Sequence, residues 1–269
     1  MRTDTAATAP VAPCRSFPLR MRAGAGLIAV LVGLTATFTT TCTPRASAAG
    51  NLAGMTVVLD PGHNGVADSS ISRQVPNGRG GTKACNTSGT STNDGYPEHS
   101  FNWDVALHIR DALNQLGVQT ALTRDSDNGV GPCVDQRAAL ANAAKPDAII
   151  SIHADGGPAS GSGFHVNYSS PPVTDVQAGP TVQLATTMRD ALVASGLHES
   201  NYIGAQGLYG RADLAGLNLA QFPAVLVELG NMKNAADAAQ IESPDGRAKY
   251  AKAVTDGITT YLSNKAPTR

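Results

Sequence analysis

The feature that most constrains the fold is a set of three short apolar runs, each followed closely by a residue that can bind a metal or move a proton. Runs of this length, rich in Val and Ile, predict buried strands. Residues 57–59 precede His63, residues 148–152 precede His153, and residues 224–227 precede Glu228. The first run is followed by Asp60-Pro61-Gly62, whose Pro and Gly favour a turn at the end of a strand.

Segments with helical periodicity lie between these runs. The clearest is residues 97–116, where Phe101, Val105, Ile109 and Leu116 form an apolar stripe that ends at Gly117. Further helices are expected at 133–144, 181–195 and 247–264, and further strands at 118–123 and 163–168. Strands that alternate with helices predict a single α/β domain with a largely parallel sheet.

The first 48 residues have the pattern of a secretory signal peptide. Arg15, Arg20 and Arg22 precede a short apolar run at 27–34, and a small-residue A-x-A pattern follows at 46–48. We therefore expect residues 1–48 to be removed, residues 49–269 to form the catalytic domain, and the protein to be exported to the periplasm or cell wall or secreted.

The remaining 221 residues are enough for one well-buried domain and short for two. They carry 15 Lys and Arg against 20 Asp and Glu, and no basic patch that would indicate nucleic acid or a membrane surface as partner. No dimerising module is recognisable, so we expect a monomer. Two cysteines are left, Cys85 and Cys133, and in an exported chain such a pair favours a disulfide.

His63, His153, Glu228 and Glu98, which opens the helix at 97–116, are the candidates for a common site. Corresponding ends of neighbouring parallel strands lie together, so these four residues can meet. Two imidazoles and one carboxylate, with a fourth position left open, are typical of a catalytic zinc site. A second carboxylate beside the metal completes a hydrolase, because it can take the proton of the attacking water.

Each of these residues also has a simpler interpretation. Glu228 could form a buried ion pair with an arginine, Glu98 could favour the helix dipole, and His153 could be a hydrogen-bonded core histidine. Asp60 and Asp155 flank the candidate histidines and are candidates to support them. The other histidines are interpreted as bystanders, although His99 adjoins Glu98 and His165 could line the cleft; they are His99, His108, His165 and His198.

Four motifs resemble the zinc-dependent N-acetylmuramoyl-L-alanine amidases of the amidase-3 family. They are residues 59–65 (LDPGHNG), Glu98 at a helix start, residues 151–155 (SIHAD) and residues 223–230 (PAVLVELG), in this order. Residues 122–124 (LTR) and 136–142 (QRAALAN) fit the same pattern, so the resemblance covers nearly all of the chain after residue 48.

The resemblance implies one Zn²⁺ on His63, Glu98 and His153, with Glu228 as the catalytic carboxylate. It also implies a six-stranded sheet flanked by helices. The implied reaction is hydrolysis of the amide between N-acetylmuramic acid and L-alanine in peptidoglycan. Asn64, Arg211 and Asn218 are candidates to hold the peptide.

The chain departs from the family pattern in two places. Members often carry Asn where this chain has Asp155, and the segment 66–95 is longer than usual, which predicts a long loop or a small hairpin. A Cys85–Cys133 bond would tie that segment down beside the cleft. Two alternatives use the same zinc site: a peptidase that cuts within the stem peptide, and a non-catalytic wall-binding module with a structural zinc.

Overall fold

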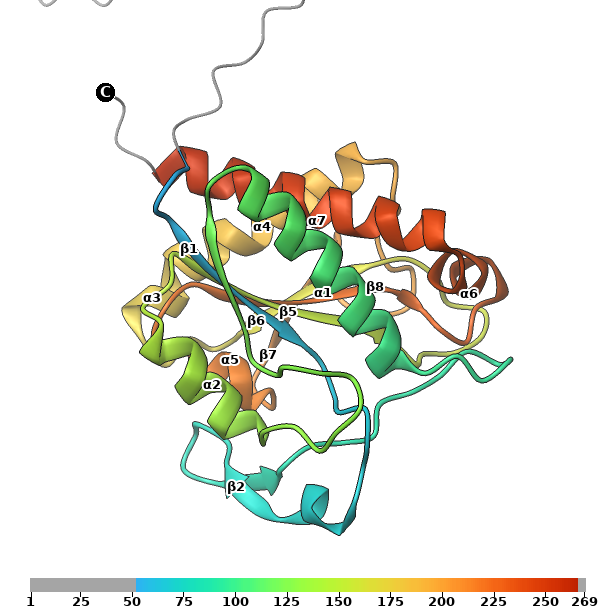
Figure 1. The fold of residues 1–269 in the computed structure, drawn as a ribbon, viewed down its shortest axis with the longest axis horizontal. Helices are drawn as coiled ribbons and strands as arrows, with labels where there is room; N and C mark the ends of the chain where they lie inside the picture. Colours follow the sequence, from blue (N-terminus) through green and yellow to red (C-terminus); the bar gives the residue numbers. More distant parts are fainter. Residues whose placement is uncertain (1–51, 266–269) are drawn as a thin grey trace, which may run out of the picture. The chain divides into compact units, whose positions relative to one another are not determined.

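The computed structural model describes residues 52–265 (Figure 1). The expected signal peptide at 1–48 lies outside the described residues and stays a prediction. Residues 52–265 belong to one compact α/β unit.

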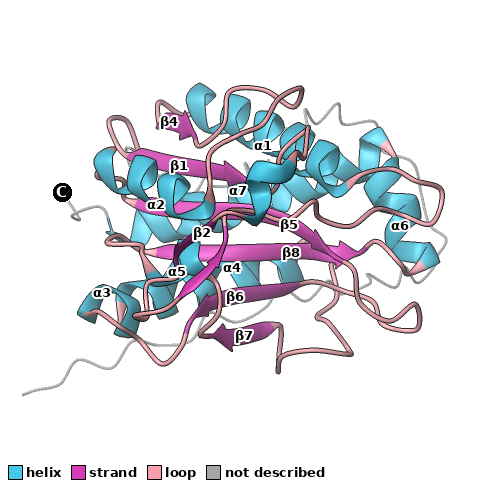
Figure 2. Cartoon of the chain, turned by 90° about the horizontal axis from the view of Figure 1, so that it is seen from below, coloured by secondary structure: helices cyan, strands magenta, loops and turns pink. Residues whose placement is uncertain are grey.

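A six-stranded sheet forms the centre of this unit, in the order β4-β1-β5-β8-β6-β7 (Figure 2). The pairs β4–β1, β1–β5, β5–β8 and β6–β7 are parallel, and β6–β8 is antiparallel, so the expected largely parallel sheet is confirmed. The strands are β1 Thr56–Pro61, β4 Gln119–Leu122, β5 Ala148–Asp155, β6 His165–Ser169, β7 Leu208–Arg211 and β8 Ala224–Asn231.

The helices expected from the sequence are present, with small shifts at their ends. They are α1 Glu98–Gln115, α2 Val134–Ala143, α4 Pro180–Ala194 and α7 Pro244–Lys265. Strand β7 and three short helices were not expected, because each is too short to show a periodic pattern. Those helices are α3 Asp175–Ala178, α5 Ala215–Asn218 and α6 Ala235–Glu242.

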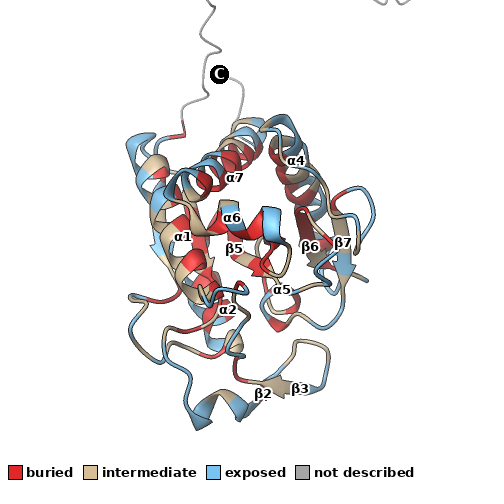
Figure 3. Cartoon of the chain, turned by 90° about the vertical axis from the view of Figure 1, so that its right-hand side faces the viewer, coloured by how far each residue is buried: buried red, intermediate tan, exposed pale blue. Residues whose placement is uncertain are grey.

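The two faces of the sheet are covered unequally. One face packs against α1, α4 and α7, whose buried sides are turned towards the sheet (Figure 3), and carries the main hydrophobic core. The other face meets only a small cluster that includes Ala141 of α2, Leu217 of α5, Ile149 and Leu226. Because successive strand residues alternate between faces, Ile150 and Ile152 belong to the first core and Ile149 to the second.

The inserted segment 66–95 forms a small hairpin on the α2 and α5 side of the sheet (Figures 1 and 3). It contains a 3-10 turn, Ser69–Ser72, and the antiparallel strands β2 Gln74–Pro76 and β3 Thr82–Ala84. Cys85 follows β3 and is bonded to Cys133 at the start of α2, as expected. The bond is buried beside Val75 and Val134, so the hairpin is fastened to α2 by a covalent link and a small apolar cluster.

No helix among residues 52–265 is long and apolar enough to cross a membrane.

Removal of the disulfide by a Cys85→Ala, Cys133→Ala double substitution is expected to lower the Tm. The bond closes a loop across a sequence separation of 48, and loop-closure entropy of that size corresponds to roughly 4 kcal/mol of stability. For a domain of this size the loss should appear as a Tm lower by about 10 °C in calorimetry. Free thiols at both positions in the native parent protein, found by non-reducing peptide mass spectrometry, would contradict the pairing.

Candidate metal and catalytic site

His63 lies just beyond the end of β1 with a positive φ of 62°, a conformation that few non-glycine residues adopt. Its Nδ1 lies 2.9 Å from the carbonyl oxygen of Thr87. A carbonyl oxygen accepts a hydrogen bond, so Nδ1 carries a proton. Nε2 faces Glu98 and donates to it when the ring is protonated, and loss of that proton would free Nε2 to bind a metal. The preceding Gly62 is required here, because a Cβ atom would lie 2.1 Å from the ring of His153.

Glu98, the first residue of α1, lies between the two histidines. Its Oε2 is 3.0 Å from His63 Nε2, and its Oε1 is 2.9 Å from His153 Nδ1. The carboxylate also accepts a hydrogen bond from the backbone N–H of Thr90 at 2.9 Å. Burial opposes its ionisation, but the hydrogen bonds from His153 and His63 outweigh burial and hold the pKa of Glu98 below its usual range.

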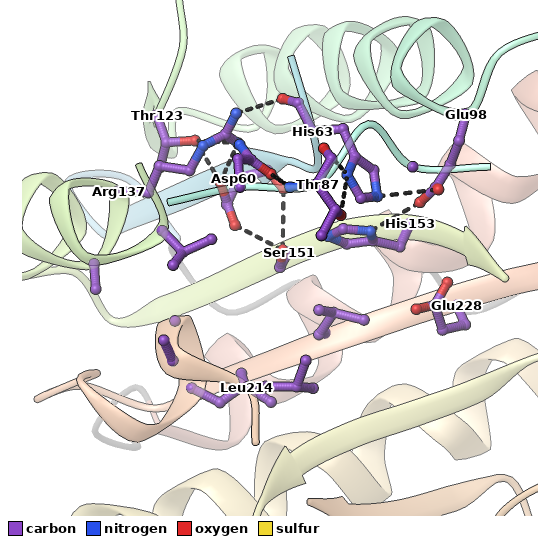
Figure 4. A pocket seen from close by; sticks show the side chains of 18 of the residues that line it. Asp60, His63, Thr87, Glu98, Thr123, Arg137, Ser151, His153, Leu214 and Glu228 are labelled. Atoms are coloured by element: carbon purple, nitrogen blue, oxygen red, sulfur yellow. Dashed lines mark hydrogen bonds and ion pairs between the residues drawn. The ribbon is translucent and has the colours of Figure 1, made fainter. Parts of the chain in front are cut away.

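One ligand atom from each of His63, Glu98 and His153 lies within 4.8 Å of the others. The structure therefore brings together the three side chains that the sequence predicted as ligands (Figure 4). Two imidazole nitrogens and a carboxylate oxygen are donors that suit Zn²⁺, and three protein ligands are typical of its catalytic sites. The donor set thus fits the predicted metal.

Glu228 lies on the strand next to His153, and the two residues are direct partners in the β5–β8 register. Its Oε2 is buried and has no hydrogen-bond partner among the described residues. Burial raises the pKa of Glu228 well above its usual range, and the charges of Glu98 and Asp155 raise it further. A carboxyl group held in this way is suited to accept and return a proton.

The strands extend past the residues that were expected to follow them. β5 continues beyond His153 to Asp155, and β8 continues beyond Glu228 to Asn231. Both strands have neighbours on each side, so their ladders continue although the side chains become polar. His153 and Glu228 are therefore held inside the sheet rather than in loops.

Arg137 of α2 fixes the end of β1 that carries His63. Its buried guanidinium donates to Asp60 Oδ1 at 2.8 Å, to the Pro61 carbonyl at 2.7 Å, and also to the carbonyl of His63. The sequence did not assign this role. An arginine within an otherwise Ala-rich helix was the available signal.

Asp60 supports the site through Arg137 rather than through a histidine. It also accepts hydrogen bonds from Thr123 at 2.5 Å and Ser151 at 2.7 Å. Burial alone would raise the pKa of Asp60, but Arg137 and the two hydroxyl groups outweigh it and lower that pKa to about 2. Asp155, the other expected supporting residue, accepts a hydrogen bond from the Tyr202 hydroxyl at 2.8 Å.

The structure does not bring the three expected peptide contacts to the cavity at the site. Asn64 accepts from Arg137 and Asn86, and Arg211 pairs with Asp213. Asn218 is buried, and its side-chain amide bonds to Arg79, Ser169, Asn77 and Ala212, which secures the hairpin.

His165, expected to be a bystander, lies closer to the site than the sequence suggested. It is the direct partner of Glu228 in the β6–β8 register, and burial lowers its pKa to about 4. His99 instead contacts Asp127, and His108 is half-exposed on α1.

A cavity of about 360 Å³ opens at the site and extends over the thinly covered face of the sheet. Its lining includes His63, Glu98, His153 and Glu228 at one end, and residues of α2, α5 and β3 further along.

The Amidase_3 family model, described as N-acetylmuramoyl-L-alanine amidase, matches residues 57–260. An N-acetylmuramoyl-L-alanine amidase of Mycobacterium tuberculosis is 61% identical over 241 residues, which cover 89% of this chain and 100% of the relative.

Solved structures of amidases are also similar to this chain. N-acetylmuramyl-L-alanine amidase Ami1 from Mycobacterium smegmatis has a TM-score of 0.79 and 62% identity, covering 80% of this chain and 100% of that chain. An amidase from Clostridium difficile 630 has a TM-score of 0.63 at 20% identity, covering 80% of this chain and 100% of that chain. The second is a likeness of fold alone.

Asp60→Asn is expected to destabilise the metal-free protein in a pH-dependent way. The folded pKa is lowered from 3.8 to about 2. The carboxylate therefore contributes about 2 kcal/mol above the unfolded pKa, and this is lost as pH falls from about 4 to about 2. Urea unfolding should show the difference from the parent at pH 7 and a smaller one at pH 3. An equal difference at both pH values, or a similar effect of the exposed Asp111→Asn, would contradict this assignment.

His63→Ala and His153→Ala should each lower zinc affinity by more than about 100-fold, because loss of a direct ligand costs more than loss of its supporting contacts. Elemental analysis after equilibrium dialysis measures bound zinc. The matched control is His108→Ala, which removes a half-exposed imidazole from α1 and should leave zinc content unchanged. Full zinc retention in both ligand variants would remove these residues from the site.

Proposed function

Because the chain belongs to the Amidase_3 family of N-acetylmuramoyl-L-alanine amidases, we propose that it is a zinc-dependent enzyme of that specificity. Its substrate is peptidoglycan, and the bond it cleaves is the amide between N-acetylmuramic acid and L-alanine. The observation that carries the proposal is the convergence of donor atoms from His63, Glu98 and His153 within 4.8 Å. Glu228 beside them supplies the acid–base group.

His63, Glu98 and His153 are the residues that would hold the ion. A zinc ion bound there would act as a Lewis acid towards the scissile carbonyl and make a nearby water more acidic. The Thr87 carbonyl and the Arg137 guanidinium keep His63 in the required tautomer and place.

Glu228 takes a proton from the attacking water and returns it to the leaving α-amine of L-alanine. Both transfers need a carboxyl group whose pKa is raised from that of a solvated glutamate. Burial raises the pKa of Glu228, and a cation bound nearby would lower it. The pKa in the working enzyme therefore lies between that of a solvated glutamate and that of Glu228 without the cation. The position of Glu228 in the sheet, opposite His153, keeps it within the cavity.

The buried, unpartnered oxygen of Glu228 favours an enzyme over a wall-binding module, since a structural site has no use for an unpaired acid. A peptidase within the stem peptide would use the same groups, and the family match argues for the amidase.

Export and a monomeric state are part of the proposal. The pattern at residues 1–48 supports cleavage of a signal peptide, which places the enzyme where peptidoglycan lies.

Glu228→Gln should reduce kcat by at least about 100-fold, the contribution of a positioned acid–base group, while zinc content stays that of the parent. Activity is measured by mass spectrometry of defined muropeptides, in which a free lactyl sugar together with an intact peptide identifies the bond cut. Glu199→Gln, at a partly exposed position paired with Arg189, is the control and should keep full activity. Unchanged turnover in Glu228→Gln would remove its role, and products cut within the peptide would replace the amidase by the peptidase.

A further inference from the structure

The cavity at the site continues as a trough along the sheet, and its floor is built from three successive pairs of β5 and β8 residues. His153 pairs with Glu228, Ser151 with Leu226, and Ile149 with Ala224. All six side chains line the cavity, since every second residue of a strand faces the same side. From His153 to Ile149 the floor extends about 13 Å, the length of about four extended residues.

The walls of the trough come from the two short helices on this face. Ala138 and Ala141 of α2 and Ala215 and Leu217 of α5 line the cavity. Their small or apolar side chains leave the space open where a larger core would fill it. The trough is therefore polar at the metal end and apolar at the far end.

Lys83 of β3 is placed over this trough by the fastened hairpin. Its Nζ donates to the Asp213 carbonyl at 3.0 Å, and the neighbouring Arg79 bonds to Asn218 and Ser169. Lys83 is half-buried and lines the cavity, so it is held in place rather than free in solvent.

The ammonium group of Lys83 makes no direct contact with a carboxylate in the described part of the chain. Within residues 52–265 it has no ion pair, because the carboxylate of Asp213 is bound by Arg211 and Lys83 reaches only the backbone oxygen. Arg137, another cation in the lining, is paired with Asp60. Burial lowers the pKa of Lys83, the nearby charge of Asp213 opposes this shift, and the charge of Arg211 adds to it.

These features suit one of the two parts of the substrate. A sugar in a glycan strand carries many hydroxyl groups, and the far end of the trough offers them few partners, which makes burial there unfavourable. A short peptide carries small apolar side chains, has a free end that can enter a trough, and carries a carboxylate that can meet Lys83.

We propose that this trough binds the peptide on the amine side of the scissile bond, and that Lys83 binds a carboxylate of that peptide. The inference rests on the proposed amidase function and adds a substrate-binding residue and the direction in which the substrate lies. The glycan then lies on the opposite side of His63, His153 and Glu228, outside the trough.

The first test compares N-acetylmuramoyl tripeptides and tetrapeptides that have free carboxylates with the same peptides as amides. With the free acids, Lys83→Met should raise KM about tenfold, the value of one charge-assisted hydrogen bond, with little change in kcat. Amidation should raise the parent's KM by the same factor and have no further effect on Lys83→Met. Calorimetry with the released peptide and zinc-loaded protein should show the same pattern. The affinity for the free acid should be lower in Lys83→Met than in the parent, and the parent should bind the amide more weakly than the acid.

The matched control is Lys252→Met, the same change at an exposed lysine of α7, which should behave as the parent. If acid and amide substrates give equal KM values and Lys83→Met resembles Lys252→Met, the inference is overturned. A parent protein that cleaves none of these substrates would instead contradict the proposed function.

A second test fills the trough. Ala141→Leu adds a side chain from the buried face of α2, and Ala139→Leu adds the same atoms on its exposed face. KM should rise for Ala141→Leu alone, with little change for Ala139→Leu. Equal KM values in the two variants would count against peptide binding in the trough. If the Tm of Ala141→Leu shows that it does not fold, the Lys83 comparison decides.

Discussion

The site depends on a single buried carboxylate that two imidazoles share. Glu98 is 4% exposed, and such a carboxylate is unstable as a charge unless other groups bind both of its oxygens. His63 and His153 do so, one oxygen each, and the backbone N–H of Thr90 adds a third contact. The two histidines come from segments 90 residues apart in the chain, so this contact requires that β1, β5 and the start of α1 meet correctly. The site therefore forms only when these elements of the fold are correctly placed.

The room for a substrate comes from the unequal covering of the sheet. The face beneath α1, α4 and α7 is filled by large side chains such as Phe101 and Met188, and it supplies most of the core. The opposite face has only α2, α5 and the hairpin. These elements bury only a small apolar cluster, and the disulfide between Cys85 and Cys133 adds stability that packing provides on the other face. A rigid sheet supported from one side can thus leave its other side open without losing the positions of His153 and Glu228.

The sequence predicted the central sheet and the site ligands because both leave local signals. Apolar runs of three to five residues mark strands that are buried on both faces, and a histidine or glutamate that follows such a run closely is unusual. The hydrophobic stripe of α1 and the glycine after it set that helix within one or two residues. The strand β7 and helix α5 gave no such signal. Each has four residues, and each is held by contacts with neighbours rather than by its own pattern.

The supporting network was beyond the reach of sequence for a different reason. Asp60 was a candidate to support a histidine, but its partners Arg137, Thr123 and Ser151 lie far from it in the chain and carry no local signal of that contact. These residues come together only because β1 lies between β4 and β5, which puts Thr123 and Ser151 on either side of Asp60. Arg137 then lies within reach of three backbone or carboxylate oxygens near His63, and its charge becomes favourable there because Asp60 is ionised. A lone arginine on an Ala-rich helix marks the place, but the partner that makes its burial possible is set by the topology of the sheet.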